Sequence, residues 1–141
     1  MKWVNLKLNV TQREMQNLFV YGTLQLPSVV LKLTGKFFET DEAVLTGFKS
    51  YCVRNCDYPA IIPNREAKVS GLLLKNVDDI SLQAIDYFEG NEYTKQKVTV
   101  IVAGKDISAF TYVWNLGKEL LEDKDWDINF FKKNFLHLYT E

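Results

Sequence analysis

The sequence predicts a single α+β domain. Its 141 residues are enough to enclose one hydrophobic core, and 47% of them are hydrophobic and 25% charged, as in ordinary globular proteins. Much of the chain consists of short β-prone runs separated by turn residues, whereas residues 80–88 and 125–138 place apolar side chains at roughly helical spacing. We therefore expect one domain over residues 1–141, with residues 1–17 as an N-terminal extension and residues 125–138 as a C-terminal helix.

The N-terminal part should contain strands and a helix around a glycine turn. Residues 1–10 alternate polar and apolar types, which indicates an edge strand or a loosely ordered extension. Residues 18–21 are β-prone and stop at Gly22, so they predict a buried strand that leads into a tight turn. A short helix is expected over residues 27–34, because proline suits a first helical turn and Gly35 can end it.

Polar residues and prolines divide the next segment. Phe37-Phe38 and residues 43–53 are β-like and are separated by the polar residues 39–42, so we expect two strands that form a hairpin. Residues 58–63 are apolar and contain two prolines. Because proline has no N–H group for a β-ladder, this segment should lie at the margin of a sheet.

A strand and a helix should follow. Residues 68–77 are β-like with Gly71 as an interruption, and Asp78 and Asp79 offer caps for a helix. The apolar residues of that helix recur at roughly helical spacing: Ile80, Leu82, Ile85 and Phe88. Glu89-Gly90 stands where the helix should end.

The last elements are a hairpin and a terminal helix. Residues 93–102 and 107–114 are β-prone and flank the turn 104–106, which predicts paired strands. The helix expected over residues 125–138 should pack on the sheet through a largely aromatic set: Trp126, Ile128, Phe130, Phe131, Phe135 and Leu138.

Charge and hydropathy argue against two classes of partner. The formal net charge is −1, so there is no basic footprint of the kind that binds nucleic acid. No apolar run approaches the roughly twenty residues that cross a bilayer, and the first ten residues lack the apolar block of a signal peptide. We expect a soluble, cytoplasmic protein that contacts neither nucleic acid nor membrane.

Cysteine and histidine are too scarce for common catalytic and metal centres. Cys52 and Cys56 are too few for a disulfide scaffold, and His137 is the only histidine. Neither a tetrahedral zinc site nor a histidine-based triad can be assembled in one chain without unusual ligands. We expect no metal or other cofactor, both cysteines as small packing residues, and His137 as a surface or packing residue.

Two segments remain as candidates for chemistry. A glycine after a strand, as in Tyr21-Gly22-Thr23-Leu24, lets backbone N–H groups converge on a carboxylate or an oxyanion, although such turns are often only structural. Glu89 follows two aromatic residues, and apolar surroundings would raise its proton affinity and suit it to act as a base. Alternatively, Glu89 points into water at the helix end. Asp86 lies one helical turn earlier and is expected to be a structural hydrogen-bonding residue.

Several motifs resemble, in order, those of the gamma-glutamylcyclotransferase-like family. They are YGTL, GFKSY, YPAIIP, KVSGLLL, LQAIDYFEGNEY and AFTYVW, and together they span residues 18–114. The resemblance implies a compact mixed β-barrel with flanking helices and a small cavity. It also implies that Tyr21, Gly22, Thr23 and Leu24 receive a gamma-glutamyl group, that Glu89 is the general acid/base, and that Tyr93 and Tyr112 line the cavity.

The implied reaction closes a gamma-glutamyl amine or amino acid to 5-oxoproline and releases the free amine. The nucleophile is the α-amine of the substrate, so no serine–histidine pair or metal is required. A small-molecule gamma-glutamyl substrate is then the partner, and the protein is expected to be a monomer or a homodimer. Two alternatives remain: a non-catalytic module that binds a small metabolite in the same cavity, and a structural protein with a vestigial cavity.

Overall fold

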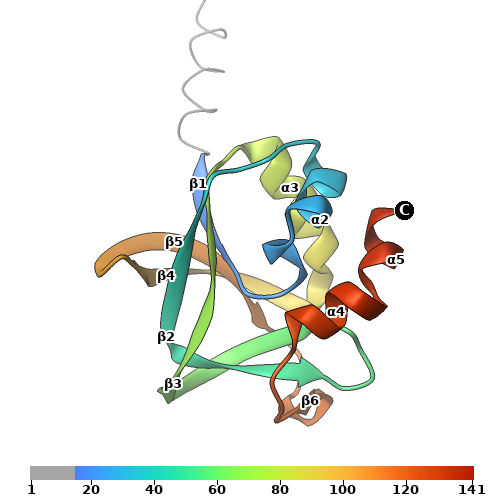
Figure 1. The fold of residues 1–141 in the computed structure, drawn as a ribbon. Coiled ribbons are helices and arrows are strands. Elements are labelled where there is room, and N and C mark those ends of the chain that lie inside the picture. The colour runs from blue at the N-terminus through green and yellow to red at the C-terminus, as the bar shows by residue number, and fades with distance from the viewer. Residues whose placement is uncertain (1–14) are drawn as a thin grey trace, which may run out of the picture.

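The computed structural model describes residues 15–141. The strand or extension expected over residues 1–10 lies outside the described residues, as does most of the segment 1–17. The described part is a closed sheet with helices gathered on one side of it (Figure 1). None of its helices is long and apolar enough to cross a membrane.

The strands close into a ring, as the family resemblance implied. Their order is β3-β1-β5-β4-β2-β6, and an additional β3–β2 pairing joins the sheet to itself. Among the described strands only β1 and β5 run parallel, and the other pairs are antiparallel. The strands are β1 (Gln16–Val20), β2 (Thr40–Val53), β3 (Pro59–Val77), β4 (Tyr93–Val102), β5 (Lys105–Trp114) and β6 (Leu121–Glu122). The expected compact mixed β-barrel with flanking helices is therefore confirmed.

The helices lie in the connections between strands and after the last strand. Helix α2 covers the predicted residues, and α3 begins after Asp78, whose carboxylate accepts from the Ser81 N–H at 3.2 Å as a cap should. The helical segments are η1 (Thr23–Gln25), α2 (Pro27–Thr34), α3 (Asp79–Glu89), η2 (Gly90–Glu92), η3 (Lys118–Leu120), α4 (Ile128–Asn134) and α5 (Leu136–Thr140).

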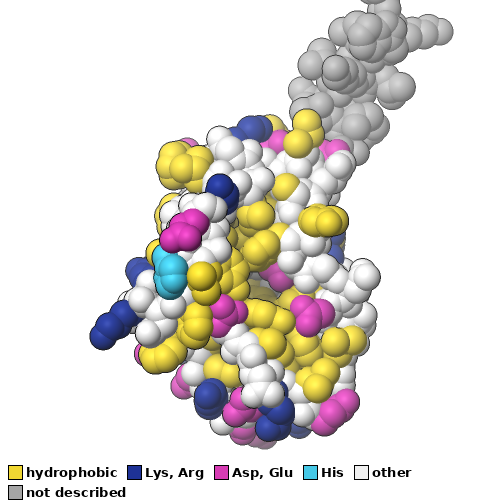
Figure 2. Space-filling model, turned by 90° about the vertical axis from the view of Figure 1, so that its right-hand side faces the viewer, with side chains coloured by type: hydrophobic (Ala, Val, Ile, Leu, Met, Phe, Trp, Pro, Cys, Tyr) yellow, Lys and Arg dark blue, Asp and Glu magenta, His cyan; other side chains and the backbone are white. Residues whose placement is uncertain are grey.

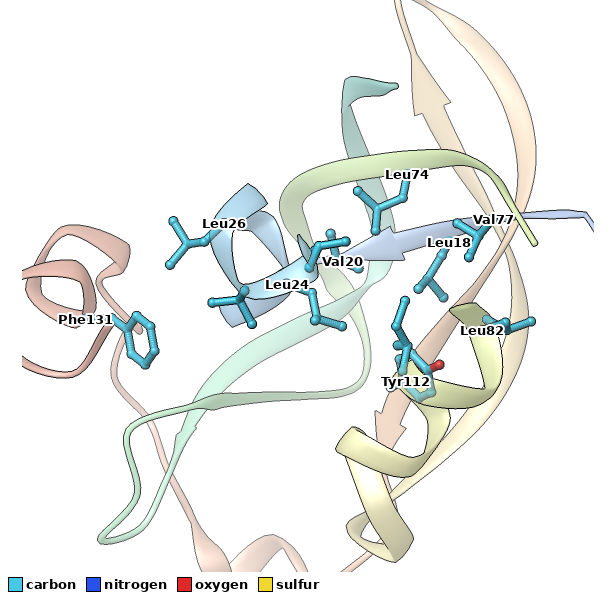
Figure 3. Close-up of a cluster of buried hydrophobic side chains, with 12 residues drawn as sticks. Leu18, Val20, Leu24, Leu26, Leu74, Val77, Leu82, Tyr112 and Phe131 are labelled. Carbon is cyan, nitrogen blue, oxygen red and sulfur yellow. The ribbon is translucent and has the colours of Figure 1, made fainter. Parts of the chain in front are cut away.

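Residues 18–20 of β1 are buried on both faces of the strand, which explains why all three are apolar. Leu18 and Val20 point into a cluster with residues of α2, α3 and α4, and Figure 3 shows part of this cluster, including Tyr112 and Phe131. Phe19, on the opposite face, packs inside the barrel with residues such as Leu45 and Val100. Strand β1, which leads to the predicted glycine turn, thus lies between two hydrophobic clusters and contributes side chains to both.

Gly71 is required by the close approach of β1 to β3. A Cβ at this position would lie 2.3 Å from the carbonyl oxygen of Val20 and 2.9 Å from the Phe19 ring. Strand β3 continues through Gly71 without interruption, so the glycine is a packing requirement within the strand.

The prediction of a hairpin within residues 37–53 is wrong. Phe37 and Phe38 lie in the connection after α2, and β2 is one continuous strand that begins at Thr40 and includes the polar residues 40–42. Thr40 pairs with Leu74 and Glu42 with Leu72, so the backbone of the polar cluster is hydrogen-bonded to β3. Polar side chains can occupy the outer face of a barrel strand, and here they mark that face instead of a turn.

Residues 58–63 do not form a separate segment. From Pro59 onwards they are the first part of the 19-residue strand β3, and residues 59–63 pair with β2 alone among the described strands. Their expected position at a sheet margin is therefore confirmed. The register of β2 against β3 shifts between Thr46 and Phe48, where Gly47 has a φ of +85°.

Two boundaries in the C-terminal third also differ from expectation. The β4–β5 hairpin is confirmed, but its turn is Ala103-Gly104, and Lys105 already belongs to β5. The single helix expected over residues 125–138 is two short helices, which meet at Phe135 with non-helical backbone angles (φ −129°, ψ −21°). Phe131 is fully buried, whereas Phe130 and Leu138 are 60% and 64% exposed, so only part of the apolar set is core.

Candidate active site

A cavity of about 150 Å³ lies between the turn after β1, the end of α3 and the start of β3. All seven residues expected to form the site line it: Tyr21, Gly22, Thr23, Leu24, Glu89, Tyr93 and Tyr112. The remaining lining residues were not expected from the sequence: Phe19, Val20, Tyr58, Pro59, Phe88, Glu92 and Tyr139. Residues far apart in the chain therefore meet in a single small cavity.

The turn after β1 lines the cavity through residues 21–24. The N–H groups of Gln25 and Leu26 donate to the carbonyls of Gly22 and Thr23 at 3.0 and 3.1 Å, which winds the chain into η1. The N–H groups at the start of such a turn have no acceptor within it. Gly22 lies so close to β3 that a Cβ would be 2.9 Å from two ring atoms of Pro59. Glycine therefore allows the turn to press against the start of β3.

Tyr21 is held by the strand that contributes the opposite wall. Its hydroxyl donates to the backbone carbonyl of Tyr112 at 2.6 Å. Burial first, and then the nearby charge of Glu89, raise the pKa of Tyr21 well above its ordinary value, so its hydroxyl stays protonated. This donor is therefore already engaged within the protein.

Glu89 is the last residue of α3, and its carboxyl lines the cavity. The following residue, Gly90, has a φ of +71°, which lets the chain leave the helix while its N–H donates to the carbonyl of Asp86. Burial raises the pKa of Glu89 to about 8, with further contributions from the negative charges of Asp86 and Glu92. No hydrogen bond or ion pair to the Glu89 side chain occurs within residues 15–141. The direction of this pKa shift is the one expected for a carboxyl in apolar surroundings.

Asp86 has the hydrogen-bonding role expected of it. It accepts from the hydroxyl of Tyr112 and from the Lys95 ammonium at 2.9 Å. Burial, followed by the contact with Asp86, raises the pKa of Tyr112 far above its ordinary value. Asp86 thus fixes one wall of the cavity and places a negative charge near Glu89.

The unexpected lining residues are joined by hydrogen bonds across the fold. The Tyr93 hydroxyl donates to the Pro59 carbonyl at 2.7 Å, and the Tyr58 hydroxyl donates to both carboxylate oxygens of Glu92 at 3.3 and 3.4 Å. Tyr139 of α5 packs edge-on against Phe88, and its hydroxyl donates to the side chain of Asp57 at 2.9 Å. Glu92 stands next to Tyr93 in the EGNEY motif, and this is the signal by which it could have been found.

The other candidate residues lie elsewhere. Cys52 is buried as expected, but Cys56 is exposed, so the packing role expected for Cys56 is wrong. His137 is exposed on α5. Neither cysteine nor the histidine lines the cavity, whose acidic groups are the two carboxyls of Glu89 and Glu92.

The sequence profile described as "Gamma-glutamyl cyclotransferase, AIG2-like" matches residues 18–128, which is well over half of the chain. This chain belongs to that family. Among curated AIG2-like relatives, AIG2-like protein C of Arabidopsis thaliana is 33% identical over 120 residues, covering 84% of this chain and 70% of the relative. AIG2-like protein B of the same plant is 32% identical over 136 residues, covering 91% of this chain and 78% of the relative.

Solved structures show the same family fold. A solution structure of a protein from Arabidopsis thaliana superimposes with a TM-score of 0.71 at 26% identity and covers 89% of each chain. A structure titled gamma-glutamyl cyclotransferase has a TM-score of 0.63 at 20% identity, with 77% of this chain and 69% of that one covered. At that identity the second likeness shows the fold alone.

Proposed function

We propose that this protein is a cyclotransferase that converts a gamma-glutamyl amine or gamma-glutamyl amino acid to 5-oxoproline and releases the free amine, with Glu89 as general acid/base. The observation that carries the proposal is the Glu89 carboxyl, which lines a small cavity beside the glycine turn, has no hydrogen-bond partner in the described chain, and has its pKa raised to about 8. Family membership supports the same activity.

The cavity suits one end of a substrate. Its volume of about 150 Å³ is below the roughly 300–1,000 Å³ of pockets that enclose drug-sized ligands, so it encloses a small group such as a glutamyl moiety. The amides at the start of η1, in the turn 22–24, are suited to a carboxylate or to an oxyanion. Aromatic side chains form much of the remaining wall and can shield the enclosed group from water.

The chemistry needs one proton carrier. The substrate's α-amine attacks its own γ-carbonyl carbon, so that a C–N bond forms and a five-membered ring closes. Glu89 takes a proton from the attacking nitrogen and returns it to the leaving nitrogen, and the original amide C–N bond breaks. The atoms balance without water or any added reagent, and the products are 5-oxoproline and an amine. The turn amides stabilise the oxyanion of the tetrahedral intermediate.

A pKa of about 8 suits both halves of this cycle. A group that titrates near the working pH can accept a proton in one step and donate it in the next, and such catalysis typically contributes about a hundred- to ten-thousand-fold in rate. A fully exposed glutamate would be a weaker base and would hold no proton for the leaving nitrogen at neutral pH.

The test is 5-oxoproline release from a panel of gamma-glutamyl amino acids and gamma-glutamyl amines, with the natural protein, Glu89→Gln and the control Glu66→Gln compared. Glu66 is an exposed carboxyl on β3 outside the cavity. Release by the natural protein and the control, with loss in Glu89→Gln, supports the proposal. Thermal stabilisation by a substrate without release from any member of the panel supports the alternative of a binding module.

A further inference from the structure

Helix α5 contributes to the wall of the cavity but is held by few contacts. Tyr139 of α5 lines the cavity, and its ring packs edge-on against Phe88, the residue before Glu89. None of the residues of α5, Leu136–Thr140, is buried. A helix of five residues has little stability of its own, so the position of α5 depends on the contacts of its inner side chains.

One hydrogen bond fastens α5 to the barrel. The Tyr139 hydroxyl donates to the carboxylate of Asp57 at 2.9 Å. Within residues 15–141, no other side-chain hydrogen bond and no ion pair joins α5 to the rest of the protein. The Tyr139 ring also packs edge-on against Phe131, with 5.1 Å between the ring centroids, and Leu136 is partly buried against the same cluster. One polar contact and a few apolar side chains therefore hold α5 in place.

The turn that carries Asp57, between β2 and β3, is fixed more firmly. The Val53 N–H donates to the Tyr58 carbonyl, and the Cys56 N–H donates to the Val53 carbonyl, both at 3.1 Å. The carbonyl of Asp57 also accepts from the indole N–H of Trp126 at 2.8 Å. Trp126 precedes α4, so the turn is bonded to the chain on both sides of that helix.

A hinge is available between α4 and α5. The backbone angles at Phe135 are not helical (φ −129°, ψ −21°). Helix α4 is anchored, because Phe131 is fully buried and the carboxylate of Asp127 accepts from two backbone N–H groups at the helix start. Phe135 lines a pocket of about 480 Å³ between α4 and the end of β2, so the break borders open space. A change of backbone angles at Phe135 can therefore move α5 while α4 stays in place.

The other walls of the cavity cannot move so easily. Strands β1, β3 and β5 belong to the closed sheet, and α3 buries Leu82 and Ile85. Figure 2 views the molecule from the side of α4 and α5, where hydrophobic and acidic side chains border a hollow. Elements with few buried contacts open at the lowest cost in free energy. Of the elements around the cavity, α5 is the one that can move with the least disruption of the barrel.

We propose that α5 is a lid over the cavity, with its hinge at Phe135 and with the hydrogen bond between Tyr139 and Asp57 as the contact that holds it closed. When the lid is closed, the Tyr139 ring shields Glu89 from water. When it opens, the ring leaves Phe88, and the cavity can exchange substrate and product with the solvent. The lid rests on the proposed cyclotransferase activity for its purpose, whereas its motion is measured without turnover.

The reaction rate of a thiol inside the cavity measures the opening. Thr23 lines the cavity and is 6% exposed, and cysteine is similar to threonine in size. With the two natural cysteines removed by Cys52→Ala and Cys56→Ser, Thr23→Cys supplies the sole thiol. Its reaction with a bulky aromatic disulfide reagent is followed by absorbance. Asp57→Ala and Tyr139→Phe each remove the hydrogen bond, and each should speed the reaction about five- to tenfold.

Two controls separate lid opening from general loosening. Because Asp57→Ala and Tyr139→Phe remove the same bond, the double variant should react no faster than either single variant. Leu138→Ala, on the exposed side of α5, should leave the rate unchanged. Cys52 is buried beside α4, and with Cys56→Ser as the only other change it is the sole thiol. Its reaction rate should not respond to Asp57→Ala, because α4 stays in place.

An unchanged rate for Thr23→Cys in both bond-deleting variants would overturn the proposal. Equal acceleration at Thr23→Cys and at Cys52 would also overturn it, because α4 and α5 would then loosen together instead of α5 turning at Phe135. Leu24→Cys, at the next lining position, replaces Thr23→Cys if that variant does not fold. A protein that releases no 5-oxoproline would refute the proposed function, whereas the thiol rates alone decide whether the lid opens.

Discussion

The hydroxyl of Tyr112 donates to the carboxylate of Asp86 and so ties β5 to α3 one helical turn before Glu89. The backbone carbonyl of the same tyrosine accepts from Tyr21. One residue therefore connects the strand that carries the glycine turn with the helix that carries the proposed base, and the position of each depends on the other.

Removing the charge of Asp86 should lower the pKa of Glu89. Asp86 is the second cause of its increase, after burial, so in Asp86→Asn the carboxyl should ionise at lower pH. In a plot of kcat/KM for 5-oxoproline release against pH, the acid limb should therefore shift to lower pH. Lys95→Gln is the opposing control. It leaves Asp86 without its ion pair and should shift the acid limb to higher pH. Shifts in the same direction for both variants would contradict this account.

Stability should fall as the pH rises through the titration of Glu89. Its pKa is about 8 in the folded protein against 4.5 as the ordinary value, so between these values the folded state binds more protons than the unfolded state. The free energy of unfolding should be higher near pH 4.5 than near pH 8 as far as this group contributes. Urea unfolding across this range should show a flatter profile for Glu89→Gln, whose neutral amide carries no ionisation cost. Parallel profiles for the two proteins would disprove this contribution.

Gly22→Ala should damage the site more than the fold. Its Cβ would meet Pro59 at 2.9 Å, and such overpacking typically costs about 1–3 kcal/mol and should push the turn away from β3. We expect a lower urea midpoint with retained cooperativity and a larger fractional loss of 5-oxoproline release. Gly71→Ala is the comparison, because its Cβ would meet backbone at 2.3 Å and should prevent folding. Full activity in Gly22→Ala would show that the turn need not lie against Pro59.

Tyr139→Ala should expose Glu89 to water and lower its pKa, because burial is the main cause of the increase. Tyr139→Phe keeps the ring and loses only the hydrogen bond to Asp57, so it should cost about 1 kcal/mol in the free energy of unfolding and leave the pH profile nearly unchanged. Leu138→Ala is the matched control on α5, since Leu138 is 64% exposed. If the pH profile of Tyr139→Ala matched that of the natural protein, the Tyr139 ring would not contribute to the burial that raises the pKa of Glu89.

Local patterns predicted the elements that carry the site but not everything that surrounds it. Helix α2 and the end of α3 at Glu89 follow from caps, prolines and glycines that act within a few residues. The hairpin over residues 37–53 was wrong because a polar run on the outer face of a long strand resembles a turn in composition. The break between α4 and α5 at Phe135 could not be predicted in the same way, because no glycine or proline lies there.

The cavity walls that were missed depend on contacts between distant residues. Tyr58 meets Glu92 across 34 positions, and Tyr139 meets Asp57 across 82. The residue pattern within one helix or strand cannot predict such pairs, because they form only through the closure of the barrel and the packing of α5. The resemblance supplied Tyr93 and Tyr112, whereas the hydroxyl partners of both required the structure.

The closed ring of strands has a consequence for folding. Strand β1 joins β5 through the Thr111 hydroxyl, which donates to the Phe19 carbonyl at 2.9 Å over a separation of 92 residues. Contacts of such long range form slowly, since much of the chain must be ordered before they can be made. The wall of the cavity that Tyr21 and Tyr112 form is therefore completed only when β1 and β5 pair, so the site depends on a contact between the two ends of the described barrel sequence.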